Sequence, residues 1–349
     1  MIDKYACPER IARDQYEYLI VDEFLRTLID VQSVNYVLET GIIDDLTDTS
    51  ANSLPNRPSV EPDSLLSKIL CANGVLTVCD GKYQLSDRFE TALRYRDYLQ
   101  TKIDFIQLVI NDWTQRFASL ITEKTEFISN SNLFGVFDYS KALKTTPEAL
   151  AETGSWVKLT TGLTRYESSI PLEHLDFSKT QRLLDVGGNS GELARQICHR
   201  NSHLSATVFD LPGVCDYGRQ YLQTLPGGEA VTFIAGDLRA AKLPQGYDTI
   251  FFKSVLHDWP DVVVENVLDQ AVKIIKKCKG RVFIFERVSN GDLPLGNSCA
   301  MLPAISFHDY YRNWQWYVDF FQARGCSIEE MKIIRIDMEF ILISITPGV

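Results

Sequence analysis

The chain has 349 residues, a formal net charge of −11 at pH 7, and a composition that is 45% hydrophobic and 23% charged. The length exceeds what one ordinary hydrophobic core needs, so it predicts two domains, and the composition is typical of a soluble globular protein. The negative charge argues against a protein that binds duplex nucleic acid, because such binding needs a basic surface that neutralises phosphates.

The chain shows no targeting or membrane-spanning pattern. Its N-terminal stretch, MIDKYACPERIARDQ, lacks the apolar core of a signal peptide, and no run of about 18 apolar residues follows that would cross a membrane. The eight cysteines are scattered and form no CxxC motif, which is typical of reduced thiols. We therefore expect a cytoplasmic protein that works without a membrane or nucleic-acid partner.

The first third of the chain favours helices. Apolar residues recur at helical spacing over 9–46, with a helix end near Gly41, and the three prolines of residues 50–62 predict a loop. A short amphipathic helix follows over 63–76, and either Asp63 or Ser64 is a suitable N-cap. Asp80-Gly81 then joins two short β-prone runs, as expected of a hairpin turn.

A helix followed by a hairpin is the pattern of a winged helix. This one carries few basic residues, so we interpret it as a scaffold rather than a DNA-binding module. The aromatic and leucine-rich stretch over 93–128 predicts a helical core or subunit interface, and a linking helix is expected between 129 and 171. We thus predict a mainly helical, dimerising domain over 1–165 and a second domain over 166–349, giving a homodimer.

The second domain opens with RLLDVGGNSG, residues 182–191, followed by the helix-like ELARQICHR. A short apolar run, an acid and a cluster of small residues predict a buried parallel strand that turns sharply into a helix beside a ligand. Four further apolar runs follow, at 204–210, 231–235, 247–253 and 281–288, separated by helical patterns. This alternation predicts an α/β fold with a doubly wound, mostly parallel sheet.

Polar residues stand at the carboxyl ends of these predicted strands: Asp185, Asp210, Asp237, His257 and Glu286. In open α/β sheets ligands bind along that edge, so the series predicts a nucleoside-type ligand. Asp210 lies where a carboxylate can accept hydrogen bonds from both hydroxyls of a ribose. The loop is G-G-N-S-G rather than G-x-G-x-x-G, which argues against NAD.

Taken together, LLDVGGNSGELA, TVFDLPGV, GDL, FFKSVLHDWPD and VFIFERV resemble the two-domain class I S-adenosylmethionine (SAM)-dependent O-methyltransferases. That family includes caffeate-type, hydroxyindole and bacterial tailoring enzymes of secondary metabolism. The resemblance covers about 165–349 well and the N-terminal part more loosely. It implies a Rossmann-like methyltransferase domain, SAM as methyl donor, S-adenosylhomocysteine (SAH) as product, and a small, aromatic hydroxyl compound as acceptor.

The resemblance also implies roles for individual residues. On the cofactor side it implies that the amino-acid end contacts Asp185, Gly187 and Gly191. The ribose would contact Asp210 and Leu211, and the adenine would contact Asp237 and Leu238. Lys253 would line the same site. On the acceptor side His257 would be the general base, since a phenol with a pKa of about 10 needs help to ionise at neutral pH. Glu286 would orient His257 and raise its basicity.

Other residues of the acceptor side carry structural alternatives. Asp258 could bond locally or cap the next helix, and Trp259 is expected to pack. The loop departs from the family pattern at Asn189, where a glycine is usual, but asparagine tolerates left-handed backbone better than most residues. Many relatives also have a second glutamate beside the histidine. Counting back from Gly325-Cys326, that position falls near Tyr311, which is no acid.

His308 lies just before Tyr311 and raises a second hypothesis. With His257 and Asp258 it could form a two-histidine, one-carboxylate face for a divalent metal. That set resembles a phenylpyruvate C-methyltransferase, in which a metal would stabilise the enolate of a 2-oxo acid. The alternative is that His308 is an ordinary pocket or packing residue, and no metal is then required. A third hypothesis is a protein that binds SAM but transfers no methyl group.

Overall fold

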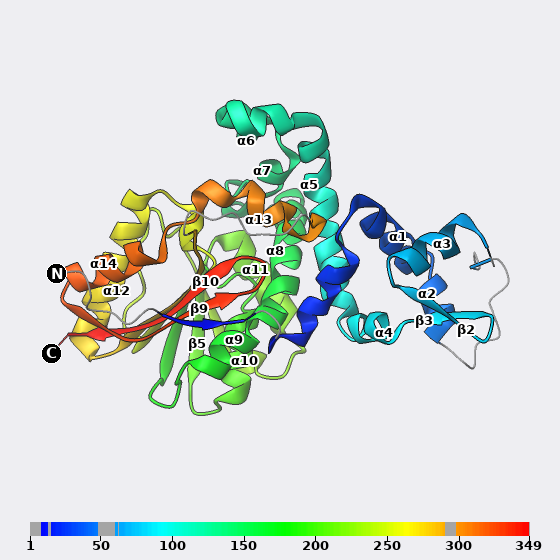
Figure 1. Cartoon of the computed structure of the whole chain (residues 1–349). Helices are drawn as coiled ribbons and strands as arrows, with labels where there is room; N and C mark the ends of the chain where they lie inside the picture. The colour runs from blue at the N-terminus through cyan, green and yellow to red at the C-terminus, as the bar shows by residue number, and fades with distance from the viewer. Residues whose placement is uncertain (1–7, 13–14, 48–59, 62, 290–297, 349) are drawn as a thin grey trace. The chain divides into compact units, whose positions relative to one another are not determined.

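The computed structural model describes residues 8–12, 15–47, 60–61, 63–289 and 298–348. The chain divides into two compact units: Met1–Arg13, Arg116–Pro294 and Phe307–Val349 form one, and Asp14–Gln115 with Leu295–Ser306 form the other (Figure 1). Residues 116–165 thus group with the sheet, although the sequence placed the domain boundary at 165. The reason is that α8 (Pro147–Glu167) packs against the sheet-covering helices α10 (Glu192–Arg200) and α11 (Pro212–Leu222).

The larger unit is built on one mixed sheet whose strands lie in the order β1-β9-β10-β8-β7-β4-β5-β6. Its strands are β1 (Glu9–Ile11), β4 (Arg182–Val186), β5 (Ser205–Asp210), β6 (Val231–Ala235), β7 (Thr249–Lys253), β8 (Arg281–Arg287), β9 (Cys326–Arg335) and β10 (Glu339–Pro347). Strands β6, β5, β4, β7 and β8 are parallel, whereas β10 runs antiparallel to both β8 and β9. The predicted doubly wound, mostly parallel sheet is confirmed.

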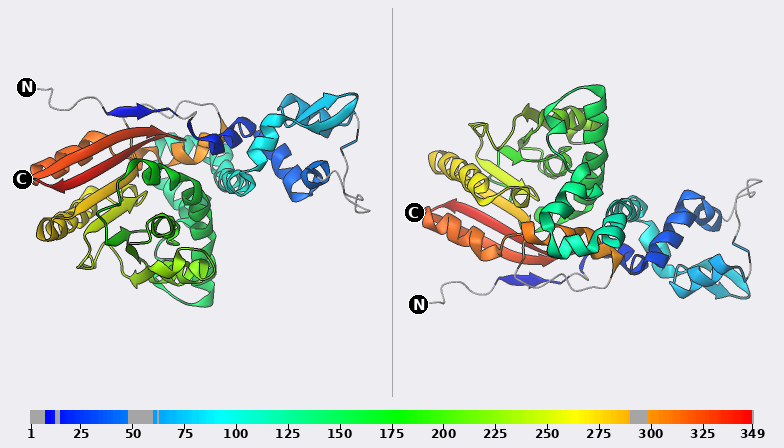
Figure 2. Two further views of the ribbon diagram at one scale, coloured as in Figure 1. Left: turned by 90° about the horizontal axis from the view of Figure 1, so that it is seen from below. Right: turned by 90° about the horizontal axis from the view of Figure 1, so that it is seen from above.

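The central strands are apolar because helices cover both faces. Four residues of β7 and five of β8 are buried in succession. Helix α12 (Asp261–Cys278) packs on β8 and β10, and α14 (Trp314–Ala323) on β9, whereas α10 and α11 pack on β5 and β6. Figure 2 shows β9 and β10 side by side next to α14. Strand β4 lies between β5 on one side and β7 on the other. The strand order reverses at β4, so ligands are expected at the carboxyl end of this strand.

Shorter helical segments complete the larger unit. They are α6 (Lys124–Asn130), α7 (Asn132–Val136), η3 (Lys141–Leu143), α9 (Ser169–His174), η4 (Gly228–Ala230), η5 (Leu256–Asp258) and η7 (His308–Tyr310). Helix α8 is the linking helix predicted between 129 and 171. No helix in the described part of the chain is both long and apolar enough to cross a membrane.

The smaller unit is mainly helical. It contains η2 (Glu17–Phe24), α1 (Leu28–Glu39), α2 (Ile42–Thr47), α3 (Leu65–Ala72), α4 (Asp87–Leu93), η6 (Cys299–Met301), α13 (Leu302–Ser306) and most of α5 (Arg96–Thr122). Ser64 caps α3 by accepting a hydrogen bond from the N–H of Ser67 at 3.1 Å. A hairpin of β2 (Leu76–Cys79) and β3 (Lys82–Leu85) follows, and its turn residues Asp80 and Gly81 both have positive φ, as predicted.

One sequence-based prediction is wrong at its start. Residues 9–11 were assigned to a helix, but they form β1, which pairs in parallel with the edge strand β9. A partner strand satisfies the backbone there, and local periodicity carries no sign of it. The helix end near Gly41 is confirmed, since Gly41 has φ +74° between α1 and α2. The predicted loop over 50–62 lies almost wholly outside the described residues.

Candidate active site

The loop after β4 is shaped by left-handed backbone. Gly187, Asn189 and Gly191 have φ of +68°, +57° and +79°, which glycine adopts freely and asparagine tolerates. A Cβ on Gly187 would lie 2.3 Å from a methyl carbon of Val255, so no other residue fits there without movement. The N–H of Asn189 donates to Oδ2 of Asp210 at 2.8 Å, which ties the loop to the end of β5. Asn189 therefore fills the place of the usual glycine.

Asp185, near the end of β4, is a buried carboxylate without hydrogen-bond partners among the described residues. Its side chain is buried, and neither carboxylate oxygen has a hydrogen-bond partner in the described part of the chain. Burial raises the pKa of Asp185 to about 7, and the charge of Asp210 adds to the rise. A buried carboxylate without partners is costly, and a ligand that brings N–H donors would remove this cost. The residues present thus fit the amino-acid end of SAM, which carries an ammonium group.

Asp210 ends β5 and is partly satisfied. Its Oδ1 accepts from the N–H of Leu211 at 2.7 Å and its Oδ2 from Asn189, while burial raises its pKa to about 6. A carboxylate has about four acceptor positions, so both oxygens keep capacity for ribose hydroxyls. Leu211 is buried beside it, in a small apolar cluster that includes Trp156.

Asp237 lies in a different setting from Asp210. Both of its oxygens accept from Nε of Arg239, at 2.8 and 2.9 Å, and the Arg239 hydrogen bond lowers its pKa. The same guanidinium lies 4.9 Å from the ring centre of Trp259, and Leu238 is buried. The contact of Asp237 and Leu238 with the adenine therefore stays a prediction.

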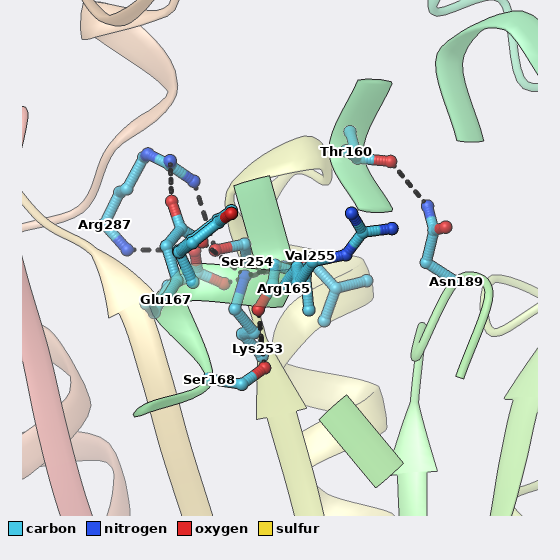
Figure 3. A network of polar contacts seen from close by, with 12 residues as sticks. Thr160, Arg165, Glu167, Ser168, Asn189, Lys253, Ser254, Val255 and Arg287 are labelled. Carbon is cyan, nitrogen blue, oxygen red and sulfur yellow. Dashed lines mark hydrogen bonds and ion pairs between the residues drawn. The ribbon is translucent and has the colours of Figure 1, made fainter. Parts of the chain in front are cut away.

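Lys253 ends β7 and belongs to a buried ionic network (Figure 3). Its ammonium donates to Glu167 at 2.6 Å and to the hydroxyl of Thr164 at 3.1 Å. The other oxygen of Glu167 accepts from Arg287 at 3.0 Å, and Arg287 also donates to the hydroxyl of Ser254. Burial alone would raise the pKa of Glu167, but Lys253 and Arg287 hold it below its ordinary value. The ammonium of Lys253 is therefore engaged within the protein.

This network fixes the turn that carries the histidine. Ser254, immediately after β7, has φ +48°, and the N–H groups of Val255 and Leu256 donate to Oε2 of Glu286 at 2.9 and 2.7 Å. Glu286 is fully buried in β8. Its Oε1 lies 2.6 Å from Nδ1 of His257. Strand β8 thus sets both the turn and the orientation of the imidazole.

His257 is flanked by carboxylates on both ring nitrogens. Nδ1 faces Glu286, and Nε2 lies 3.4 Å from Oδ1 of Asp258. Burial alone would lower the pKa of His257, but Glu286 and then Asp258 raise it above its ordinary value. Burial would raise the pKa of Glu286, but His257 holds it below its usual range. The two carboxylates therefore stabilise the protonated form of the imidazole.

Tyr311 and His308 occupy different surroundings. The ring of Tyr311 is buried 5.3 Å from the ring of His257, which is where the counting from Gly325 placed it. His308 instead contacts Ser289 through Nε2 and Asp309 through Nδ1, each at 3.2 Å. Among the described residues, no three His, Cys, Asp or Glu side chains converge so that they could hold a metal ion. The proposed face of His257, Asp258 and His308 is therefore not assembled.

Two residues of this region escaped the sequence analysis. Tyr139 donates from its hydroxyl to Oδ2 of Asp258 at 2.9 Å, and Glu167 holds the network of Lys253. Asp258 thus contacts its neighbour His257 through Oδ1, a local contact of the kind the sequence allowed, and a distant side chain through Oδ2. Trp259 packs as predicted, with its ring 5.6 Å from that of Tyr139. Neither Tyr139 nor Glu167 lies in a motif, so no local signal pointed to them.

Comparison with known proteins agrees with this geometry. Residues 117–302 match the family described as O-methyltransferase domain, which is more than half of the chain. The chain belongs to this family. A match of that extent covers strands β4 to β8 and the histidine turn, hence all of the proposed cofactor residues.

Relatives of this O-methyltransferase-domain protein extend the comparison. It is 28% identical over 276 residues to the L-tyrosine C(3)-methyltransferase of Streptomyces lavendulae, covering 75% of this chain and 73% of that protein. It is also 28% identical over 164 residues to the 3-hydroxy-5-methyl-1-naphthoate 3-O-methyltransferase of Streptomyces sahachiroi, covering 46% of this chain but only 47% of that protein. The second match thus spans about half of the relative's length.

Among solved structures, human N-acetylserotonin methyltransferase in complex with SAM has the same fold. The TM-score is 0.65 at 18% sequence identity, with 91% of this chain and 94% of that chain covered. At this identity the likeness establishes the fold and not the substrate.

Proposed function

We propose that this chain transfers a methyl group from SAM to a hydroxyl of a small aromatic acceptor, with His257 as general base. The observation that supports this best is the 2.6 Å contact between Nδ1 of His257 and Oε1 of Glu286, at the carboxyl edge of the parallel strands. With Nδ1–H donated to a buried carboxylate, the lone pair of the neutral imidazole lies on Nε2. That nitrogen, which lies 3.4 Å from Oδ1 of Asp258, can then take a proton.

The residues divide the chemistry between them. Bound SAM supplies an electrophilic methyl group on its sulfonium, and SAH remains after transfer. Nε2 of His257 takes the proton of the acceptor hydroxyl, while the oxygen forms the new bond to the methyl carbon. The negative charge of Glu286 stabilises the imidazolium that results. Alignment of the two reacting atoms contributes the rest, because the sulfonium methyl needs no further activation.

Three groups would hold the donor. Asp185 would accept from its ammonium group, and Asp210 would accept from its ribose hydroxyls. The loop at Gly187 would frame its amino-acid end, as the family resemblance implies. This assignment rests on the unpartnered oxygens of Asp185 and on the remaining acceptor capacity of Asp210.

The test is turnover of SAM by the full chain with a panel of phenols, including L-tyrosine and 3-hydroxy-naphthoates as probes, followed by mass spectrometry of SAH and the methylated product. We expect His257→Gln to lower kcat at least about 100-fold, and Glu286→Gln about 10- to 100-fold. The affinity for SAH should stay unchanged in both variants. His203→Gln is the matched control, because Nε2 of His203 contacts the backbone carbonyl of Phe177 rather than a residue of the proposed site.

The outcomes separate the hypotheses. Near-normal turnover in His257→Gln would refute the general-base role. SAM binding without SAH formation across the whole panel would favour the protein that binds SAM but methylates nothing. The metal-assisted reaction of a 2-oxo acid predicts turnover of phenylpyruvate that a chelator abolishes, and no cluster of the described residues supports it.

A second candidate is methylation of an aromatic ring carbon. It is favoured by one observation, the 276-residue match to a protein named as a tyrosine C(3)-methyltransferase. His257 would again remove the phenolic proton, which makes the carbon next to the hydroxyl nucleophilic. That carbon would form the bond to the methyl group, and the ring proton would then leave to a base. Fragmentation of the product by mass spectrometry distinguishes O-methylation from C-methylation, because the methyl group is lost readily from an ether oxygen but not from a ring carbon.

The homodimer and the cytoplasmic location expected from the sequence belong to the same proposal. Helix α1 exposes Leu28, Ile29 and Tyr36, and α3 exposes Leu65. An apolar surface of this kind supports contact with a second copy of the mainly helical unit.

A further inference from the structure

Tyr139 lies between α7 and η3 and is clamped by two indole rings. Its ring centre is 5.2 Å from that of Trp156 and 5.6 Å from that of Trp259. Its hydroxyl donates to Oδ2 of Asp258 at 2.9 Å. The hydroxyl is held as a donor, because burial and then the charge of Asp258 raise the pKa of Tyr139 well above its ordinary value.

The opposite oxygen of the same carboxylate faces the histidine. Oδ1 of Asp258 lies 3.4 Å from Nε2 of His257, while Oε1 of Glu286 lies 2.6 Å from Nδ1. A carboxylate at this distance stabilises the imidazolium more than the neutral ring. Many relatives are expected to have a second glutamate near the histidine, at the position of Tyr311, which has no charge to offer.

We propose that Tyr139 is a positioning residue for the methyl transfer: its hydrogen bond fixes Asp258 against Nε2 of His257, so that Asp258 serves as the second acid that the Tyr311 position lacks. Its catalytic consequence rests on the proposed function, but its effect on the histidine does not. Asp258 would stabilise the imidazolium that forms when the acceptor loses its proton. Without the phenol donor, the carboxylate would be free to turn or to take a proton itself.

The segment around Tyr139 is anchored firmly enough for such a role. Tyr139 packs on a small cluster that includes Ala142, Trp156, Leu211 and Val214. A Cβ on Gly213, in α11, would lie 3.2 Å from the carbonyl oxygens of Ala142 and Lys144, so the chain passes close over that helix. Because Leu211 follows Asp210 directly, the cluster links the proposed cofactor side to the acceptor side.

The charged and titratable groups that face His257 come from several elements. Glu286 and Arg287 lie on β8, Asp258 on η5, and Tyr311 follows η7. Glu286 and Asp258 raise the pKa of His257, whereas Arg287 lowers it. Loss of the Asp258 charge should therefore lower the pKa of His257, because one of the two stabilising anions is gone.

The test is a titration of the histidine ring signals by NMR in the ligand-free full chain, which needs no acceptor. Only five histidines occur, so His257→Gln identifies the signal. We expect the pKa of His257 to fall in Asp258→Asn, and to fall by less in Tyr139→Phe, where the carboxylate remains but loses its donor. The control is Tyr217→Phe, since Tyr217 packs on the same cluster but its ring stacks on Tyr221.

A His257 titration in Tyr139→Phe that matches the wild type and Tyr217→Phe would overturn the proposal. If Tyr139→Phe does not fold, the test rests on Asp258→Asn. An unchanged or raised pKa of His257 in that variant refutes the role of Asp258. In turnover assays, Tyr139→Phe should lower kcat about threefold to tenfold and leave the KM for SAM unchanged. If Tyr139→Phe has a normal kcat but a lowered pKa of His257, Tyr139 affects the charge state of the histidine in the ligand-free protein only, and its role in methyl transfer is refuted.

Discussion

Two parts of the carboxyl edge of the sheet hold their carboxylates in opposite ways. On the β5 side, which comprises the ends of β4 and β5, Asp185 has no partner for either oxygen within the described residues, and Asp210 accepts only backbone N–H groups. On the side of β7 and β8, Glu167 binds two cations, and Glu286 binds His257 and several N–H groups. The pKa values of these four residues differ in the same way: those of Asp185 and Asp210 are raised, and those of Glu167 and Glu286 are lowered.

The difference indicates what each side is built for. An unsatisfied carboxylate costs stability until a ligand supplies donors, so the β5 side is completed by binding. A carboxylate of the β7–β8 side is paired within the protein itself, so this side holds its histidine without the help of a ligand. Changes on the β7–β8 side should therefore damage the fold, whereas changes on the β5 side should improve the fold and damage binding.

The largest effect on stability is expected at Glu167. Glu167→Gln keeps the shape of the side chain but leaves Lys253 and Arg287 buried without their shared anion. Removing one partner from a buried ionic network typically costs about 3–5 kcal/mol, so the free energy of unfolding should fall by that order. Urea denaturation followed by tryptophan fluorescence measures it.

Glu152→Gln on the same helix is the matched control. Glu152 pairs with Lys141, but both side chains are about half exposed, so its loss should leave the unfolding midpoint unchanged. Equal stability of the two variants would show that the Glu167 network contributes nothing and would remove the contrast between the two sides.

An intermediate effect of opposite sign is expected at Asp185. Its folded pKa of about 7 exceeds the ordinary 3.8, so its contribution to stability is present below pH 3.8 and is lost as the pH rises through 7. At pH 8 the ionised group costs on the order of 4 kcal/mol, and part of that remains for an unpaired amide. Asp185→Asn should thus stabilise the ligand-free protein at pH 8 by about 1–3 kcal/mol and weaken SAM binding at least tenfold.

The measurement is thermal unfolding at pH 5 and pH 8, with calorimetry of SAM binding. At pH 5 the carboxyl is protonated in the folded wild type but ionised in the unfolded chain, so only part of the cost is present and the difference between the two proteins should be smaller than at pH 8, which serves as the internal control. A variant that is less stable than wild type at pH 8 would contradict the raised pKa. Glu286 has the opposite sign, since its lowered pKa means that its contribution is lost as the pH falls below 4.5.

The smallest effect is expected at Asn189. Asn189→Gly relieves the positive φ but removes three side-chain contacts, to Thr160 at 2.8 Å, to the N–H of Ser190 at 2.6 Å and to the hydroxyl of Thr161 at 3.4 Å. The two terms oppose each other, so the free energy of unfolding should change by less than about 1 kcal/mol. Asn189→Ala loses the contacts and keeps the strain, and should be the less stable variant. Equal melting temperatures for the two would show that the backbone at 189 is not strained.

Much of the fold was predictable because its signals are local. The five parallel strands were recognised from consecutive apolar residues, and the hairpin at Asp80-Gly81 from two adjacent residues. The placement of β1 was missed, because Glu9–Ile11 takes its conformation from β9, more than 300 residues later in the chain. The assignment of Lys253 was incomplete for a similar reason, since its partner Glu167 lies on a helix 86 residues earlier.

Local patterns were enough to locate the loop after β4, the acids at the strand ends and the histidine that follows β7. These depend on neighbouring residues, whose backbone preferences and spacing can be read in order. Which of these groups meet depends on the packing of distant segments. Tyr139 reaches Asp258 across 119 residues, and Glu167 reaches Arg287 across 120, while His308 is directed to Ser289 and Asp309. Such pairings depend on how helices pack over the sheet, and side-chain periodicity does not encode them.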